Sequence, residues 1–131
     1  MNFTISELVQ SATAKKENIE NTPDLESLDN MLELICSCLQ PIRDKIKNPM
    51  IITSGYRCAE LNRIVGGKPN SQHLRGEAVD FIIKGITPAK IVDFILKTGI
   101  DFDQLINEKN QWVHISYTKK RKNRRDCFLS Y

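Results

Sequence analysis

The stretch SQHLRGEAVDFII, residues 71–83, decides how the fold of this chain is interpreted. From Ala78 to Ile83 the residues alternate, so that valine, phenylalanine and isoleucine share one face of a β-strand. That apolar face is predicted to lie in the hydrophobic core, and the Asp80 carboxylate is expected on the opposite face. His73 precedes the strand in a loop, and Gly76 allows the chain to turn and bring the imidazole back over the strand.

The other histidine of the chain lies in a strand of the same kind, WVHISY, residues 112–117. Alternation places His114 on the face opposite to Val113 and Ile115, so His114 and Asp80 are expected on one surface of a sheet. With His73 they make a set of two imidazoles and one carboxylate. Such a set suits a zinc ion and leaves a fourth coordination position open for water. The alternative is a pair of ordinary surface histidines.

The remaining sequence predicts one α+β domain over residues 1–131, because a chain of this length leaves no room for a second domain of ordinary size. Helices are predicted from Thr4 and over 24–46, 58–65 and 87–97. Strands are predicted over 50–53, 78–83, 104–108, 112–117 and 126–129, the third and fourth as a hairpin, and 68–75 as a loop. We expect helices on one face of a small, mainly antiparallel sheet and the metal site on the other.

Apolar residues at spacings of three and four predict the core-facing stripe of the long helix. Pro41 falls within this pattern and removes a backbone donor, so a kink or break is expected near Gln40. The residues of the predicted stripe are Leu25, Leu28, Leu32, Ile35, Leu39, Ile42 and Ile46.

Composition limits the other functions that the chain could have. No apolar run approaches the roughly 20 residues of a membrane span, and no signal peptide is recognisable, so we expect a protein that is cytoplasmic as synthesised. We also expect a monomer. Cys36 and Cys38 stand two apart in a helical pattern and point away from each other, which argues against a disulfide between them. All four cysteines, with Cys58 and Cys127, are expected to be reduced and mostly to fill the core.

The net charge of +3 is unevenly spread, because lysines and arginines crowd between residues 119 and 125. We interpret this cluster as a solvated hairpin loop between Tyr117 and Phe128; the alternative is an attraction for phosphates or an anionic polymer. No recognition helix or aromatic platform accompanies the cluster, so we expect no specific binding of nucleic acid.

In combination, the motifs of this chain resemble the zinc D-Ala-D-Ala carboxypeptidase family. The similarity is greatest to its short branch, found among phage endolysins and phage-like genes, and the family shares a superfamily with Hedgehog signalling domains. The similarity covers nearly the whole chain. It is carried by Ser54-Gly55-Tyr56-Arg57, Leu61-Asn62, Gly66-Gly67, Ser71-Gln72-His73, Gly76, Ala78, Asp80-Phe81, Trp112-Val113-His114 and Asn123-Arg124-Arg125.

The resemblance implies a Hedgehog/DD-peptidase-like fold and a zinc metallopeptidase that cleaves D-amino-acid-containing bonds in the stem peptide of bacterial peptidoglycan, either as a carboxypeptidase or as an endopeptidase. It assigns His73, Asp80 and His114 as ligands of Zn²⁺. Glu108 matches the general base, and Arg57 matches the arginine that faces the substrate carboxylate or the developing oxyanion. Ser71 matches a substrate-side hydroxyl.

One departure from the family pattern concerns the base and leaves the ligands untouched. Several branches place an acidic residue three positions before the last histidine, where this chain has Gln111. Without catalysis, Glu108 would be a solvent-facing residue at a hairpin turn made by Lys109 and Asn110, and Arg57 would form a salt bridge with a nearby carboxylate. The corresponding alternative for the whole chain is a catalytically silent, zinc-stabilised binding module.

Overall fold

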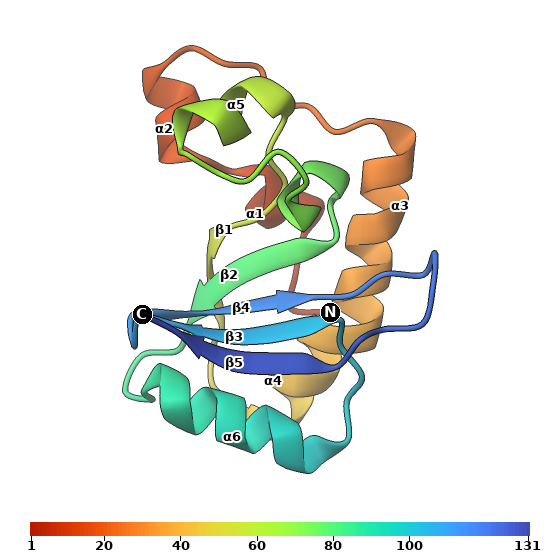
Figure 1. The fold of residues 1–131 in the computed structure, drawn as a ribbon, viewed down its shortest axis with the longest axis vertical. Helices are drawn as coiled ribbons and strands as arrows, with labels where there is room; N and C mark the ends of the chain where they lie inside the picture. Colours follow the sequence, from red (N-terminus) through yellow and green to blue (C-terminus); the bar gives the residue numbers. More distant parts are fainter.

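A five-stranded sheet forms the centre of the computed structural model, which describes residues 1–131 (Figure 1). The strand order is β1-β2-β4-β3-β5, and every neighbouring pair is antiparallel except β3 and β5. The α+β class and the mainly antiparallel sheet are therefore confirmed. The strands are β1 (Ile51–Ser54), β2 (Ala78–Ile82), β3 (Gln104–Glu108), β4 (Trp112–Ser116) and β5 (Asp126–Ser130).

The predicted hairpin is present and joins β3 to β4. Lys109 and Asn110 both have positive φ angles, 56° and 57°, which suit the right-handed twist of the two strands. The Asn107 side chain closes the turn, because its carbonyl accepts from the Asn110 N–H and its amide donates to the Asn110 side chain. This turn fixes the register that pairs Glu108 with Trp112.

Helices occupy most of the first half of the chain and one later segment. The capping box predicted at Thr4 and Glu7 is present at the first helix, but a second short helix was not predicted. The α-helices are α1 (Ile5–Val9), α2 (Ala12–Lys16), α3 (Leu25–Leu34), α4 (Gln40–Ile46), α5 (Ala59–Ile64) and α6 (Pro88–Thr98).

The break expected near Gln40 takes the form of a π-helical segment, η1 (Ile35–Leu39), between α3 and α4. Pro41 lies in the first turn of α4, where its missing N–H disturbs the backbone least. The widened turns of η1 come directly before the proline and keep the three segments on one continuous helical path.

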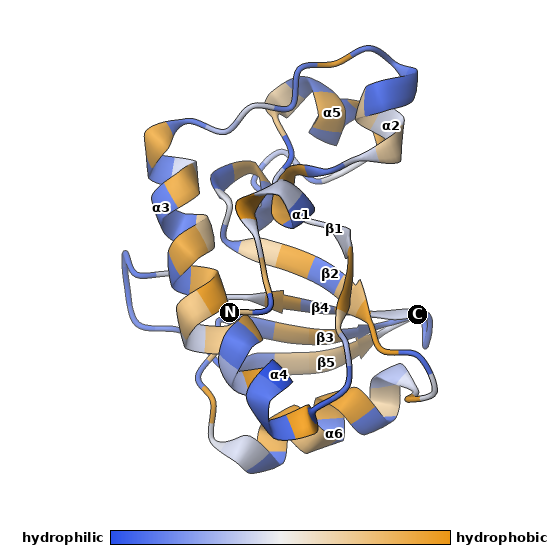
Figure 2. Cartoon of the chain, turned by 180° about the vertical axis from the view of Figure 1, so that it is seen from behind, coloured by the Kyte–Doolittle hydropathy of each residue, from blue (hydrophilic) through white to orange (hydrophobic).

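One hydrophobic core lies between these helices and the sheet. Val79 and Phe81 of β2 and Val113 and Ile115 of β4 belong to it, as the alternation predicted. Each covering helix is amphipathic, with a hydrophobic and a hydrophilic side (Figure 2). The buried apolar residues of α3, η1, α4 and α6 are Met31, Leu34, Ile35, Cys38, Leu39, Ile42, Ile91 and Ile95.

The predicted stripe of the long helix is wrong at its start. Leu25 and Leu32 are exposed, with 85% and 48% of their surface accessible. Met31 and Leu34 fill the core in their place, so the buried face is rotated by about one residue from the leucine pattern. Leucine spacing alone could not distinguish these neighbouring faces, because both are largely apolar.

The segment 68–75 is not entirely a loop, because a 3-10 helix, η2 (Gln72–Arg75), closes it. The Ser71 hydroxyl accepts from the His73 N–H and begins the turn, and Gly76 ends it with a φ of 72°. A single 3-10 turn is too short to produce a periodic pattern, so composition indicated only a loop.

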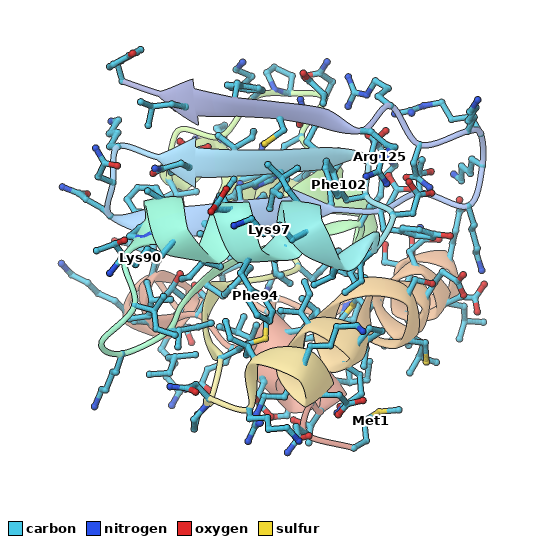
Figure 3. The ribbon with its side chains drawn as sticks, turned by 90° about the horizontal axis from the view of Figure 1, so that it is seen from below. Met1, Lys90, Phe94, Lys97, Phe102 and Arg125 are labelled. Carbon is cyan, nitrogen blue, oxygen red and sulfur yellow. The ribbon has the colours of Figure 1, made fainter.

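The basic segment after β4 is not a hairpin, which corrects the prediction. β5 pairs in parallel with β3 instead of antiparallel with β4, so residues 117–125 cross from the middle of the sheet to its edge. Arg125 lies at one end of the sheet with its guanidinium 4.9 Å from the centre of the Phe102 ring (Figure 3). Two arginines of this segment bind the carboxylate of the buried Asp103, and these contacts hold the segment against the start of β3.

The cysteines form no disulfide, and only Cys38 is fully buried. Desolvation raises the pKa of the Cys38 thiol far above its ordinary value. Cys36 and Cys127 are exposed, so the prediction that the cysteines mostly fill the core is wrong for these two.

Candidate metal centre

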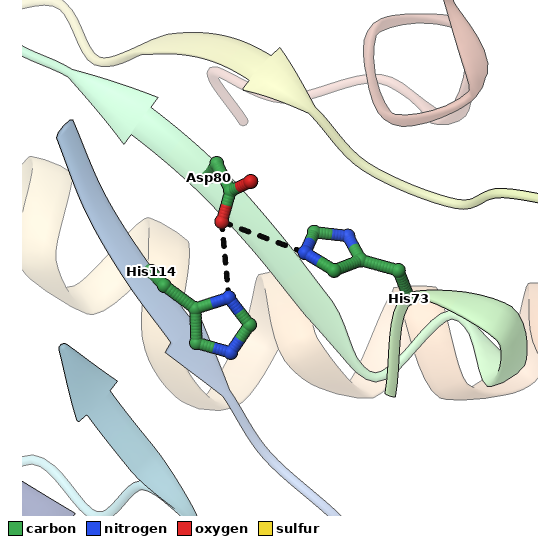
Figure 4. Close-up of side chains that lie close together, drawn as sticks. All are labelled: His73, Asp80 and His114. Atoms are coloured by element: carbon green, nitrogen blue, oxygen red, sulfur yellow. Dashed lines mark hydrogen bonds and ion pairs between the residues drawn. The ribbon is translucent and has the colours of Figure 1, made fainter. Parts of the chain in front are cut away.

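Two histidines and one aspartate converge on the sheet surface that faces away from the long helices (Figure 4). The Asp80 carboxylate oxygen lies 3.4 Å from His73 Nε2 and 3.0 Å from His114 Nδ1. One ligand atom from each residue lies within 4.8 Å of the other two. The structure thus brings together all three residues that the sequence predicts as metal ligands.

Strand register places Asp80 and His114 side by side. Both are directly paired between β2 and β4, so their side chains leave the sheet on the same face. Burial alone would raise the pKa of the Asp80 carboxyl, but hydrogen bonds and charge from His114 and His73 hold it well below its usual range. The Asp80 carboxyl is therefore ionised at neutral pH, as a candidate oxygen ligand must be.

His73 is held in one orientation by the neighbouring backbone. Its Nδ1 lies 2.7 Å from the Gly55 carbonyl oxygen, which can only accept, so Nδ1 carries the proton. Nε2 faces Asp80: it can donate to the carboxylate when the ring is protonated, and it offers its lone pair to a metal when the ring is neutral. A histidine whose second nitrogen donates to a carbonyl is the usual arrangement at protein metal sites.

The donor set fits zinc. Two imidazole nitrogens and one carboxylate oxygen, nearly buried and already oriented, match the three protein ligands of a tetrahedral ion with one open position. Calcium and magnesium prefer sites made of oxygen alone, so the nitrogen donors argue against both. Other divalent transition-metal ions that accept imidazole nitrogen would compete with zinc for such a site.

Gly55 is required where the metal centre meets the N-terminal helix. A Cβ at this position would lie 2.1 Å from the Leu8 carbonyl oxygen, a backbone atom that already accepts from the Tyr56 N–H. The chain therefore approaches α1 more closely than any other residue would permit.

We expect Gly55→Ala to lower the free energy of unfolding by about 1–3 kcal/mol, because the added methyl group must displace backbone. The same shift moves the carbonyl that orients His73, so zinc affinity should also fall. Urea unfolding and zinc titration would measure the two effects. Thr53→Ala on the exposed part of β1 is the control, and unchanged stability in Gly55→Ala would contradict the steric argument.

Arg57 lies next to the metal centre and forms no salt bridge. Its backbone N–H donates to the His73 carbonyl, and its Nε is buried without a hydrogen-bond partner. Burial lowers the pKa of the guanidinium, while the nearby Asp80 charge raises it. A buried donor without a partner is costly in a folded protein and is typical of a group that awaits a ligand.

Glu108 reaches the same surface from the end of β3. Ile106 pairs with His114, and Glu108 stands two residues further along the same face. It is partly exposed and forms no salt bridge or side-chain hydrogen bond, so its carboxylate is free to meet a ligand. Gln111 lies in the exposed turn beyond it.

A pocket of about 820 Å³ contains all six predicted site residues in its lining: Arg57, Ser71, His73, Asp80, Glu108 and His114. Ser71 has a structural task as well, because its hydroxyl caps η2. The sequence did not predict that Arg121 and Arg124 also line this pocket. Arg124 is among the residues that carry the family resemblance, but the run of basic residues was interpreted as a solvated loop.

A comparison with family models matches residues 1–116 to the family described as peptidase M15. The matched region contains every candidate metal ligand together with Arg57 and Glu108. No curated protein matches the chain. None of the helices combines the length and apolar character needed to cross a membrane.

Proposed function

The chain belongs to the peptidase M15 family, and on that premise we propose that it is a zinc metallopeptidase that hydrolyses D-amino-acid-containing bonds of peptidoglycan stem peptides. The observation that carries the proposal is the convergence of His73, Asp80 and His114 in a pocket wide enough for a peptide. A metal centre of purely structural use would be closed by a fourth protein ligand.

Zinc in this site would supply a Lewis acid for the scissile carbonyl and for the attacking water. Glu108 would accept a proton from that water, because it projects from the same face of the sheet as His114 and has no competing partner. It would then return the proton to the departing amine. Its position at the end of β3, in the lining of the same pocket as the three candidate ligands, supports this role.

Arg57 would stabilise the negative charge that develops on the carbonyl oxygen, or would hold the carboxylate of a substrate that ends nearby. The Arg57 guanidinium supports either contact, because it lines the pocket and its side chain donates to no protein group. The neighbouring Asp80 charge and the fixed Arg57 backbone keep the side chain close to the reacting centre.

We expect the purified protein to contain about one zinc ion per chain and to release D-alanine or new amino groups from purified peptidoglycan. Elemental analysis measures the first and amine or D-alanine assays the second. EDTA should abolish cleavage, and added zinc should restore it. Zinc without cleavage would favour a silent, zinc-stabilised binding module, and no metal after zinc supplementation would overturn the proposal.

A further inference from the structure

We propose that Arg121 and Arg124, held together by the buried Asp103, bind a second carboxylate of the substrate peptide, two to three residues from the bond that is cut. The inference rests on the proposed peptidase function and specifies the substrate: an acidic peptide whose extra carboxylate lies away from the reacting bond. Arg57 is not part of this subsite, because it does not contact Asp103 and its backbone is bound to His73.

Asp103 is fully buried at the start of β3, with 0% of its side chain exposed. Both of its oxygens are occupied by the two arginines. Arg121 donates from Nη1 and Nη2 at 2.7 and 3.0 Å, and Arg124 donates from Nη2 at 2.7 Å, from Nε and from its backbone N–H. Burial would raise the pKa of the carboxyl, but these bonds hold it well below its usual range.

Among the groups in direct contact, the cluster has one positive charge in excess. Two guanidinium groups share the Asp103 carboxylate, and the Glu77 and Asp126 charges act on Arg121 and Arg124 from further away. Arg121 and Arg124 keep 47% and 50% of their side chains exposed, and no protein group accepts from Arg121 Nε or Arg124 Nη1. The arginines therefore have both the charge and the free donors that a carboxylate ligand needs.

The segment that carries the arginines is fixed before any ligand arrives. The Asn123 side chain both accepts from the Thr118 N–H and donates to the Thr118 carbonyl, which closes the loop. Lys119 and Lys120 form salt bridges with Asp29 and Glu26 of α3. A rigid pair of guanidinium groups loses little conformational entropy on binding, so this arrangement favours affinity.

The position of the cluster sets its distance from the bond that is cut. Asp103 donates its backbone N–H to the Ser116 carbonyl, and it precedes Ile106, the partner of His114, by three residues along β3. Three strand residues span about 10 Å. An extended peptide covers this distance in about three residues, and Arg121 and Arg124 line the same pocket as the metal ligands.

The pocket as a whole favours an anionic ligand. Six basic side chains line it against two acidic ones, and one of those acids, Asp80, is a candidate metal ligand. The basic residues are Arg57, Lys68, Arg75, Lys109, Arg121 and Arg124. Such an excess of positive charge attracts acidic peptides and discriminates against basic ones.

The test compares peptidoglycan stem peptides with copies in which each non-terminal carboxyl group is converted in turn to a carboxamide. One conversion, two to three residues from the cleaved bond, should raise KM roughly tenfold in the native protein, as expected for loss of a charge-assisted bond. Arg121→Gln should lose this preference, and Arg124 remains to neutralise Asp103 in that variant. Arg121→Lys should recover part of it.

Lys122→Gln is the matched control, because it removes one charge from the same segment and Lys122 does not line the pocket. It should keep the full preference. Calorimetric binding of the same peptides to the zinc-loaded protein gives a readout that does not need cleavage, so failure of the peptidase proposal would be seen separately. An equal preference in folded Arg121→Gln and in the native protein would overturn the inference, as would equal binding of every peptide pair.

Discussion

Asp80→Ala is expected to remove the bound metal and with it all peptidase activity. Asp80 is the residue that both histidines contact, and it contributes the only negative charge among the three candidate ligands. Loss of an outer-shell partner typically lowers metal affinity 10–100-fold, so loss of this ligand should lower zinc affinity by more than about 100-fold. Zinc content after dialysis against graded chelator concentrations would measure the change.

The same substitution should abolish the dependence of the unfolding midpoint on zinc. A ligand that binds only the folded state raises the midpoint of unfolding, and the native protein should show such a rise. Asp80→Ala should show almost none. Asp93→Ala, on the exposed side of α6, is the control and should keep both the metal and the rise. Full zinc occupancy in Asp80→Ala would show that the metal binds elsewhere.

Strand alternation made this candidate site predictable from the sequence. A period of two leaves only two faces, so the apolar face of β2 and β4 placed Asp80 and His114 together without further information. His73 required more, because η2 and the Gly55 carbonyl orient it through contacts that are distant in sequence. The turn allowed at Gly76 suggested His73 as a partner of the other two, and the family resemblance supported that assignment.

Helix periodicity was a weaker guide, because neighbouring faces of a helix overlap. The capping signals placed the start of α1 and the proline placed the break before α4, since both act locally. Leu25 and Leu32 were misassigned because an apolar pattern with several leucines and one methionine allows more than one buried face. Tertiary packing decided between these faces.

The C-terminal connection could not be predicted from local sequence. β5 joins the sheet beside β3, with the pairs Gln104–Asp126 and Ile106–Phe128, and no local pattern distinguishes that partner from β4. No local pattern marks Asp103, directly before β3, as a buried residue. The burial of Asp103 and its ion pairs with two arginines depend on the return of the chain to the sheet. The basic segment was therefore interpreted as solvated.

Glu108→Gln is expected to retain zinc and the fold while turnover falls by a factor of about 10²–10⁴, the contribution of a general base. The amide has the same shape but accepts no proton at neutral pH, so the variant separates proton transfer from metal binding. Zinc content, unfolding midpoint and turnover of the same peptide substrate would be measured together. Glu60→Gln on exposed α5 is the matched control and should resemble the native protein.

A second substitution tests whether the proposed base must stand at position 108. Gln111 occupies the position at which several branches of the resembled family place an acid, and it lies in the exposed turn that follows Glu108. If the base can act from either position, Gln111→Glu should restore part of the turnover lost in Glu108→Gln. If the β3 end alone reaches the water, the double variant should remain inactive. Full activity in Glu108→Gln itself would assign proton transfer to another group.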